Sequence, residues 1–102
     1  LAKAEKKTKS ALQKQADSHF NMAVLYVRTG LHKEAEKEFL DILRLDSSAA
    51  DVHYNLAILY DRYLKDKRSA VKHYKKYLAI SPYSADAKQV RLWLMEAEME
   101  IF

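Results

Sequence analysis

The sequence predicts an all-α protein built from a repeated pair of helices, and three observations lead to that prediction. Good helix formers dominate the 102 residues, while one glycine (Gly30) and one proline (Pro82) leave too few turn residues for an all-β fold. Residues 19–28 recur as residues 53–62, 34 positions later, with six of ten residues identical. Apolar side chains follow at helical spacing, for example at Ala35, Phe39, Ile42 and Leu43.

The same patterns predict where each helix begins and ends. The five expected helices cover about residues 10–29, 32–45, 50–64, 67–80 and 84–102. Capping boxes in residues 10–13 and 48–51 are expected to open the first and the third helix. Gly30 supplies the left-handed residue that ends the first helix. Ser81 and Pro82 end the fourth, because proline cannot continue a helix.

Positive charge is concentrated at the N-terminus. The net charge is +4, and only Glu5 accompanies the five lysines of the first 14 residues, which are Lys3, Lys6, Lys7, Lys9 and Lys14. Residues 1–9 are therefore interpreted as a basic arm and residues 10–102 as the folded domain. The arm is expected to be solvated, with a contact to nucleic acid or to a membrane surface as the alternative.

Composition and motifs exclude several functional classes. The chain has no cysteine, which excludes disulfides and thiolate chemistry and leaves the compartment open. No apolar run reaches the roughly 18 residues of a membrane span. A glycine-rich phosphate loop and a His-Glu-x-x-His motif are both missing from the sequence. We therefore expect no catalytic residues, no cofactor and no enzymatic activity.

Histidine remains as a candidate metal ligand. His19 and His53 occupy the same repeat position and could face one another across a stack of helix pairs. Two residues one repeat apart, without carboxylates at ligand spacing, do not supply the three or four converging ligands that a metal needs. The sequence therefore predicts no metal site. Asp61, Asp66 and the glutamates within residues 34–38 are interpreted as parts of solvated helix faces.

The second helix of each pair also repeats, at a distance of 35 residues. Matching positions are Ala35/Ala70, Phe39/Tyr74, Ile42/Tyr77 and Ser47/Pro82. The extra residue of the second pair falls in the turn at residues 65–67, where an insertion costs little. With both helices repeating in phase, the chain resembles the tetratricopeptide repeat family, whose unit is a helix–turn–helix motif of 34 residues.

The resemblance rests on specific positions. The family's Leu–Gly/Ala–x–x–Tyr element corresponds to residues 22–26 and 56–60, and its terminal proline to Pro82. The first-helix tryptophan of the family is replaced by His19 and His53, which is a departure. The resemblance implies a right-handed α-solenoid with two tetratricopeptide repeats, at about residues 16–49 and 50–84, and a C-terminal capping helix at about residues 85–102.

The resemblance also implies a binding groove on the first helices of the pairs. Three columns of residues repeat there, Phe20–Tyr54–Gln89, Val24–Ile58–Trp93 and Val27–Asp61–Glu96. In the family this arc lines a concave groove that binds peptides, and asparagine and arginine beside it can hydrogen-bond an extended backbone or a carboxylate. The predicted groove residues are Phe20, Asn21, Val24, Val27, Arg28, Tyr54, Asn55, Ile58, Arg62, Gln89 and Trp93.

Some co-chaperones of this family clamp the C-terminal carboxylate of heat-shock chaperones with Lys and Asn. Here Phe20 and Val24 occupy the two first-helix positions, and Asp86 and Val90 replace the basic pair of the third helix. Asn55 alone matches, so a chaperone clamp is not expected.

Alternatives to peptide binding remain open. The aromatic arc could be packing surface, covered by a neighbouring chain, by further repeats or by the basic arm. The chain could self-assemble through its terminal helix, where Ile101 and Phe102 are both apolar. Nucleic acid could bind the lysine-rich arm. The residues around Tyr54 and Pro82 also resemble bacterial scaffold proteins of this family, which allows a cytoplasmic or a bacterial periplasmic location.

Overall fold

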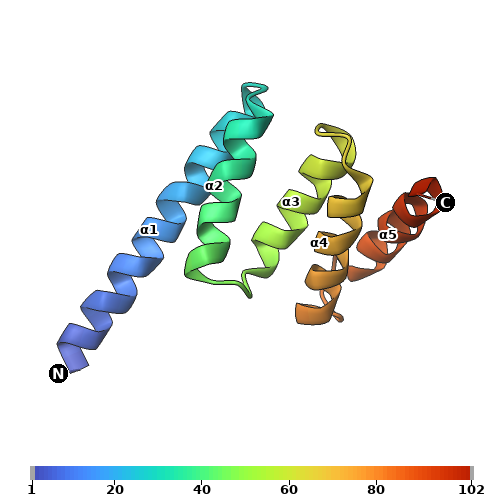
Figure 1. The fold of residues 1–102 in the computed structure, drawn as a ribbon. Helices are drawn as coiled ribbons and strands as arrows, with labels where there is room; N and C mark the ends of the chain where they lie inside the picture. Colours follow the sequence, from blue (N-terminus) through green and yellow to red (C-terminus); the bar gives the residue numbers. More distant parts are fainter. Residues whose placement is uncertain (1, 102) are drawn as a thin grey trace. The chain divides into compact units, whose positions relative to one another are not determined.

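Five α-helices make up the regular structure in this computed structural model, which describes the backbone of residues 2–101 and the side chains of residues 11–101. They are α1 (Ala2–Arg28), α2 (His32–Leu45), α3 (Ala50–Arg62), α4 (Lys67–Ile80) and α5 (Ala87–Ile101), as Figure 1 shows. The prediction of an all-α helical repeat fold is confirmed. No helix in the described part of the chain is both long enough and apolar enough to cross a membrane.

The chain divides into two compact units, and the first, Leu1–Ser47, contains α1 and α2. The C-terminal part of α1 packs against α2, while its N-terminal part extends beyond that helix (Figure 1). Ala23 on α1 and Ala35 on α2 are fully buried, as expected where small side chains let two helices approach closely. Met22, the neighbour of Ala23 in the chain, is 37% exposed, because α2 covers only one stripe of α1.

The second unit, Ser48–Phe102, contains α3, α4 and α5. The central helix is α4, which packs against both α3 and α5 (Figure 1). Ala57 on α3 and Ala70 on α4 repeat the fully buried alanine pair of the first unit. Tyr74 and Val90 are also fully buried and fill the space that these helices enclose.

The turns inside each helix pair use left-handed residues. Gly30 has φ +80 and follows α1, as predicted from its position. In the second unit Lys65 has φ +56, a conformation that an L side chain rarely adopts, and it lies in the turn that carries the extra residue. Asp66 follows, and its Oδ1 accepts a hydrogen bond from the Ser69 backbone N–H at 3.1 Å, which caps α4.

Two predicted helix starts are wrong, those of the first and the fifth helix, and the physical reasons differ. α1 begins at Ala2 instead of Ser10, because residues 2–9 are alanine, lysine, glutamate and threonine without a helix breaker. The side chains of the predicted arm lie outside the described residues. The start of α3 is as predicted, because Ala49 occupies the N-cap position and the helix begins at Ala50.

The start of α5 is also later than expected. Instead of opening the helix, Ser84 lies in the turn before it, with its Oγ 2.6 Å from the Tyr77 hydroxyl. Its carbonyl oxygen accepts a hydrogen bond from the backbone N–H of Ala87, where α5 begins. Ile101 is half-buried at the end of α5, and Phe102 lies outside the described residues.

The buried alanines give a direct test of the helix pairing. Ala57→Leu should lower the free energy of unfolding by about 1–3 kcal/mol, because a larger side chain at a close helix crossing forces the pair apart. Ala79→Leu makes the same change at an exposed position of α4 and should alter stability by no more than about 0.5 kcal/mol. Urea unfolding followed by circular dichroism measures both. Equal effects of the two changes would contradict the close crossing.

Candidate functional site

An aromatic cluster joins all three helices of the second unit. The Trp93 ring on α5 lies 6.2 Å from the Tyr54 ring on α3 and 6.2 Å from the Tyr74 ring on α4, measured between centroids. Tyr54 also lies 5.4 Å from Tyr77. Tyr74 and Tyr77 are buried, whereas Tyr54 and Trp93 are half-buried and keep one side accessible. The buried rings of Tyr77 and Tyr74 therefore pack against the half-buried rings of Tyr54 and Trp93, respectively.

A positive charge lies over the same tryptophan. The guanidinium carbon of Arg62 is 5.0 Å from the Trp93 ring centroid, which is cation–π geometry. Tyr54, Ile58 and Arg62 are each four residues apart on α3, so they form one stripe. Gln89 is exposed on α5, one turn before the tryptophan. We call these five residues the Trp93 surface: Tyr54, Ile58, Arg62, Gln89 and Trp93.

The two tyrosines next to Trp93 stay protonated over a wide pH range. Burial raises the pKa of Tyr54, and the nearby negative charge of Asp86 adds to that shift. Burial and a hydrogen bond raise the pKa of Tyr74, whose hydroxyl donates to Asp61 Oδ2 at 2.8 Å. The Trp93 surface therefore offers aromatic area, neutral hydrogen-bonding groups and one cation, which suits binding.

Asp61 corrects an expectation from the sequence. It was assigned to a solvated face, yet its carboxylate accepts the Tyr74 hydroxyl and pairs with Lys67. The hydrogen bond to Asp61 is the main reason that the pKa of Lys67 is raised. Lys67 Nζ also lies 3.2 Å from Glu100 Oε2, so this polar group links α3, α4 and α5. Asp66 and Glu38 were also assigned to solvated faces. Asp66 caps α4, and Glu38 pairs with His19.

The predicted groove residues of the first unit lie along α1. Phe20 packs edge-to-face on Phe39 of α2, with ring centroids 5.9 Å apart and an interplanar angle of 71°. Val24 and Val27 are half-buried, whereas Asn21 and Arg28 are exposed. In the second unit the Nδ2 of Asn55 donates to the backbone oxygen of Asp51 at 2.7 Å, which leaves its carbonyl oxygen as the acceptor that could meet a ligand.

Each first-helix histidine pairs with a residue from the second helix of its own repeat. In the second unit the Nδ1 atoms of His53 and His73 lie 2.9 Å apart, with the rings stacked at 5.1 Å. The Tyr60 ring stacks on the ring of His73, with the two centroids 5.6 Å apart. Burial lowers the pKa of His73 to about 4, and the neighbouring charge of His53 acts in the same direction.

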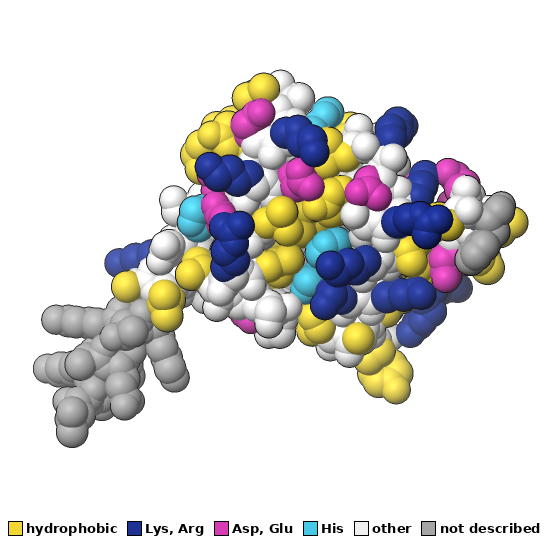
Figure 2. Space-filling view, viewed as in Figure 1, with side chains coloured by type: hydrophobic (Ala, Val, Ile, Leu, Met, Phe, Trp, Pro, Cys, Tyr) yellow, Lys and Arg dark blue, Asp and Glu magenta, His cyan; other side chains and the backbone are white. Residues whose placement is uncertain are grey.

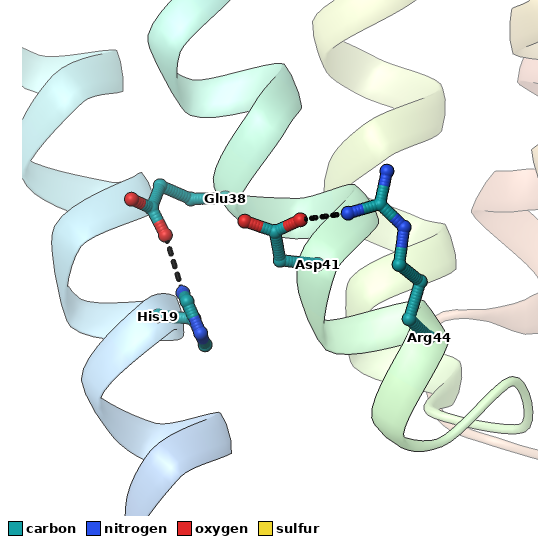
Figure 3. Close-up of polar contacts among 4 residues, drawn as sticks. All are labelled: His19, Glu38, Asp41 and Arg44. Atoms are coloured by element: carbon teal, nitrogen blue, oxygen red, sulfur yellow. Dashed lines mark hydrogen bonds and ion pairs between the residues drawn. The ribbon is translucent and has the colours of Figure 1, made fainter.

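The equivalent pair of the first unit has a carboxylate instead. His19 Nδ1 lies 2.5 Å from Glu38 Oε2, and Asp41 follows one turn later on α2 (Figure 3). One ligand atom from each of His19, Glu38 and Asp41 lies within 4.8 Å of the others. Sequence reasoning missed this group because it weighed His19 only against His53. The signal was present in residues 38–41, where two carboxylates stand three positions apart on a helix.

The outward face of α4 is different in character. Its exposed residues include Lys72, Lys75 and Lys76. Figure 2 shows lysine and arginine side chains gathered over this helix. The basic α4 face thus contrasts with the aromatic surface that α3 and α5 carry.

The His73 pair predicts a dependence of stability on pH. Because the pKa of His73 falls to about 4 on folding, the unfolded chain binds one more proton than the folded chain between that pH and the ordinary value of 6.5. Stability should therefore rise between pH 4 and 6.5, with His73 contributing a slope of at most about 1.4 kcal/mol per pH unit. His73→Gln should flatten the curve of unfolding free energy against pH in this window. Parallel curves for the two proteins would contradict the burial of a neutral His73.

Comparison with known families gives one clear match. The sequence pattern described as tetratricopeptide repeat matches residues 16–48 and residues 50–84, which together are more than half of the chain. The two matched segments agree with the repeats predicted at about residues 16–49 and 50–84. No curated protein matches the chain closely enough to count as a relative.

Proposed function

We propose that this chain, which belongs to the tetratricopeptide repeat family, is a non-enzymatic module that binds an extended segment of a partner protein at the Trp93 surface. Repeats of this family generally mediate protein–protein interaction. The matched segments cover α2 to α4 and residues 16–28 of α1, so both units take part in the repeat pattern.

One observation supports this assignment above the others. The Trp93 ring packs against the buried Tyr74, and Tyr54 and Arg62 lie next to it. The Trp93 side chain is nevertheless only half-buried. Tryptophan, tyrosine and arginine are the residue types that contribute most binding energy at protein interfaces. Side chains held in place by packing also lose little conformational entropy when a partner binds.

The polar groups nearby define what kind of segment would fit. An apolar side chain of the partner would lie across the accessible faces of Tyr54 and Trp93, where it can contact both rings. The exposed amide of Gln89 can donate to and accept from an extended backbone, and Arg62 can bind a carboxylate or a backbone oxygen. We also propose that each unit contacts the partner through its own first-helix residues. These are Asn55 in the second unit and, in the first unit, Phe20, Asn21, Val24, Val27 and Arg28.

A second candidate function, self-association, is favoured by the other side of α5. Leu92, Met95 and Met99 are 45%, 54% and 70% exposed, which leaves apolar area uncovered. Two copies could cover each other through this face. Peptide binding at the Trp93 surface does not require it, so the two functions can be separated experimentally.

Sedimentation velocity tests self-association directly. If α5 pairs with a second copy, the sedimenting mass should rise with concentration, and Met95→Glu should abolish the rise because a charge in an apolar interface remains unpaired. A mass that stays that of one chain at every concentration would reject this candidate and leave the peptide-binding proposal untouched.

Binding at the Trp93 surface is tested with a partner protein that the intact chain captures and the Tyr54→Ala variant does not retain. Because Trp93 is the single tryptophan, its emission reports on the site, and binding should shift or quench it. Tyr54→Ala should weaken the affinity by about 2 kcal/mol, roughly thirtyfold, as expected for an aromatic anchor. Circular dichroism of the free variant should still show the helices.

Tyr83→Ala provides the matched control. Tyr83 is 96% exposed in the turn before α5 and is not part of the Trp93 surface, so its loss should leave the affinity unchanged. Equal losses from the two variants would argue against the proposed site. An indole that emits as a fully buried ring, together with a Tyr54→Ala variant that unfolds, would show that the cluster is core.

A further inference from the structure

We propose that His19, Glu38 and Asp41 bind a divalent transition metal ion of the zinc class within the first unit. His19 comes from α1, and both carboxylates come from α2, one turn apart on the same face (Figure 3). One ligand atom of each residue lies within 4.8 Å of the other two. Three side chains from two helices thus converge on one point.

The donor set selects the class of metal. An imidazole nitrogen with two carboxylate oxygens suits zinc and similar ions, whereas calcium and magnesium prefer oxygen ligands alone. Around a tetrahedral zinc, ligand atoms about 2 Å from the ion lie roughly 3.3 Å apart. Small side-chain rotations would bring the three groups from their present separations to that value, with water as the fourth ligand.

The surroundings favour an ion over three unrelated surface groups. The side chains of His19, Glu38 and Asp41 are only 28%, 20% and 21% exposed. Arg44 donates to Oδ1 of Asp41, and the other carboxylate oxygen points toward Glu38 (Figure 3). Asp41 can therefore ligate a metal without giving up Arg44, whose own side chain is largely exposed.

The internal repeat offers a natural comparison. His53 stands at the position of His19, while His73 replaces Glu38 and Lys76 replaces Asp41. A lysine in the third ligand position repels a cation, so the second unit keeps the histidine and loses the site. Within the residues whose side chains are described, the first-unit group is the one that brings three such ligand atoms together.

A metal bound here would connect α1 to α2. It would bind the folded pair and not the unfolded chain, so it would raise the stability of the first unit by mass action. This role is independent of the Trp93 surface, which belongs to the second unit.

Titration calorimetry of the untagged full chain with Zn²⁺ tests the proposal. We expect saturable binding of one ion per chain, and Co²⁺ in its place should give visible d–d absorption that reports a nitrogen and oxygen ligand set. Glu38→Gln and Asp41→Asn keep the side-chain shape and remove a ligand charge. Each should raise the dissociation constant more than about tenfold, which is the least that loss of even an outer-shell partner costs.

Two further variants distinguish ligation from general electrostatic attraction. Glu34→Gln removes an exposed carboxylate from the same helix and should leave the dissociation constant unchanged. Arg44→Ala removes the nearby cation and should tighten binding by up to about fivefold, the range of an exposed ion pair. The proposal is overturned if Zn²⁺ does not saturate at one ion per chain. It is also overturned if Glu34→Gln weakens binding as much as Asp41→Asn, or if Arg44→Ala weakens it.

Discussion

The close approach of the first and second helix in each repeat is the constraint on which the other features depend. Ala23, Ala35, Ala57 and Ala70 are all fully buried, and each side chain is small enough to let the helices approach. Once the alanines face inward, the rotation of each helix about its axis is set. Every other side chain is then placed by its spacing from an alanine.

The functional features follow from that rotation. Tyr54 lies three positions before Ala57 on α3, close enough to the core to rest on Tyr77 and far enough from it to stay accessible. Tyr74, four positions after Ala70, is fully buried and supports Trp93 from below. The aromatic cluster is therefore a continuation of the core to the surface, which explains why its outer rings can be both rigid and partly exposed.

The histidine position shows how one structural slot can carry different chemistry. It lies four residues before the first-helix alanine and always meets the second helix of the same pair. In the second unit the partner is His73, whose pKa is lowered by burial. In the first unit the partner is Glu38, and one turn later a second carboxylate adds to the group. The second unit thus has a buried histidine pair where the first unit has a candidate cation site. The two positions that differ are His73, which corresponds to Glu38, and Lys76, which corresponds to Asp41.

Local patterns predicted the helices and failed where the deciding interaction was not local. Gly30 ended α1 as expected because its conformational freedom is a property of the residue itself. Ser10 was expected to cap the first helix, but a cap competes with continued helix, and the surrounding alanines and lysines favour continuation there. The repeats were predictable from their spacing, and the family match confirms them.

The contacts of polar side chains were less predictable. Asp61 and Glu38 read as solvated because a sequence shows charge and helix face, not the residue that meets that face. The aromatic cluster was predicted only in part: the sequence aligned Trp93 with Ile58, and the structure shows its rings in contact with Tyr54 and Tyr74 and Arg62 above it.

Site-specific photo-crosslinking tests most directly whether a partner binds on the Trp93 surface. A photoreactive phenylalanine analogue at position 89 would sit beside Trp93, and the same analogue at position 76 would sit on the basic face of α4. Irradiation with a bound partner should link the chains from position 89 and leave position 76 unlinked. A link from position 76 without one from position 89 would contradict binding at the Trp93 surface.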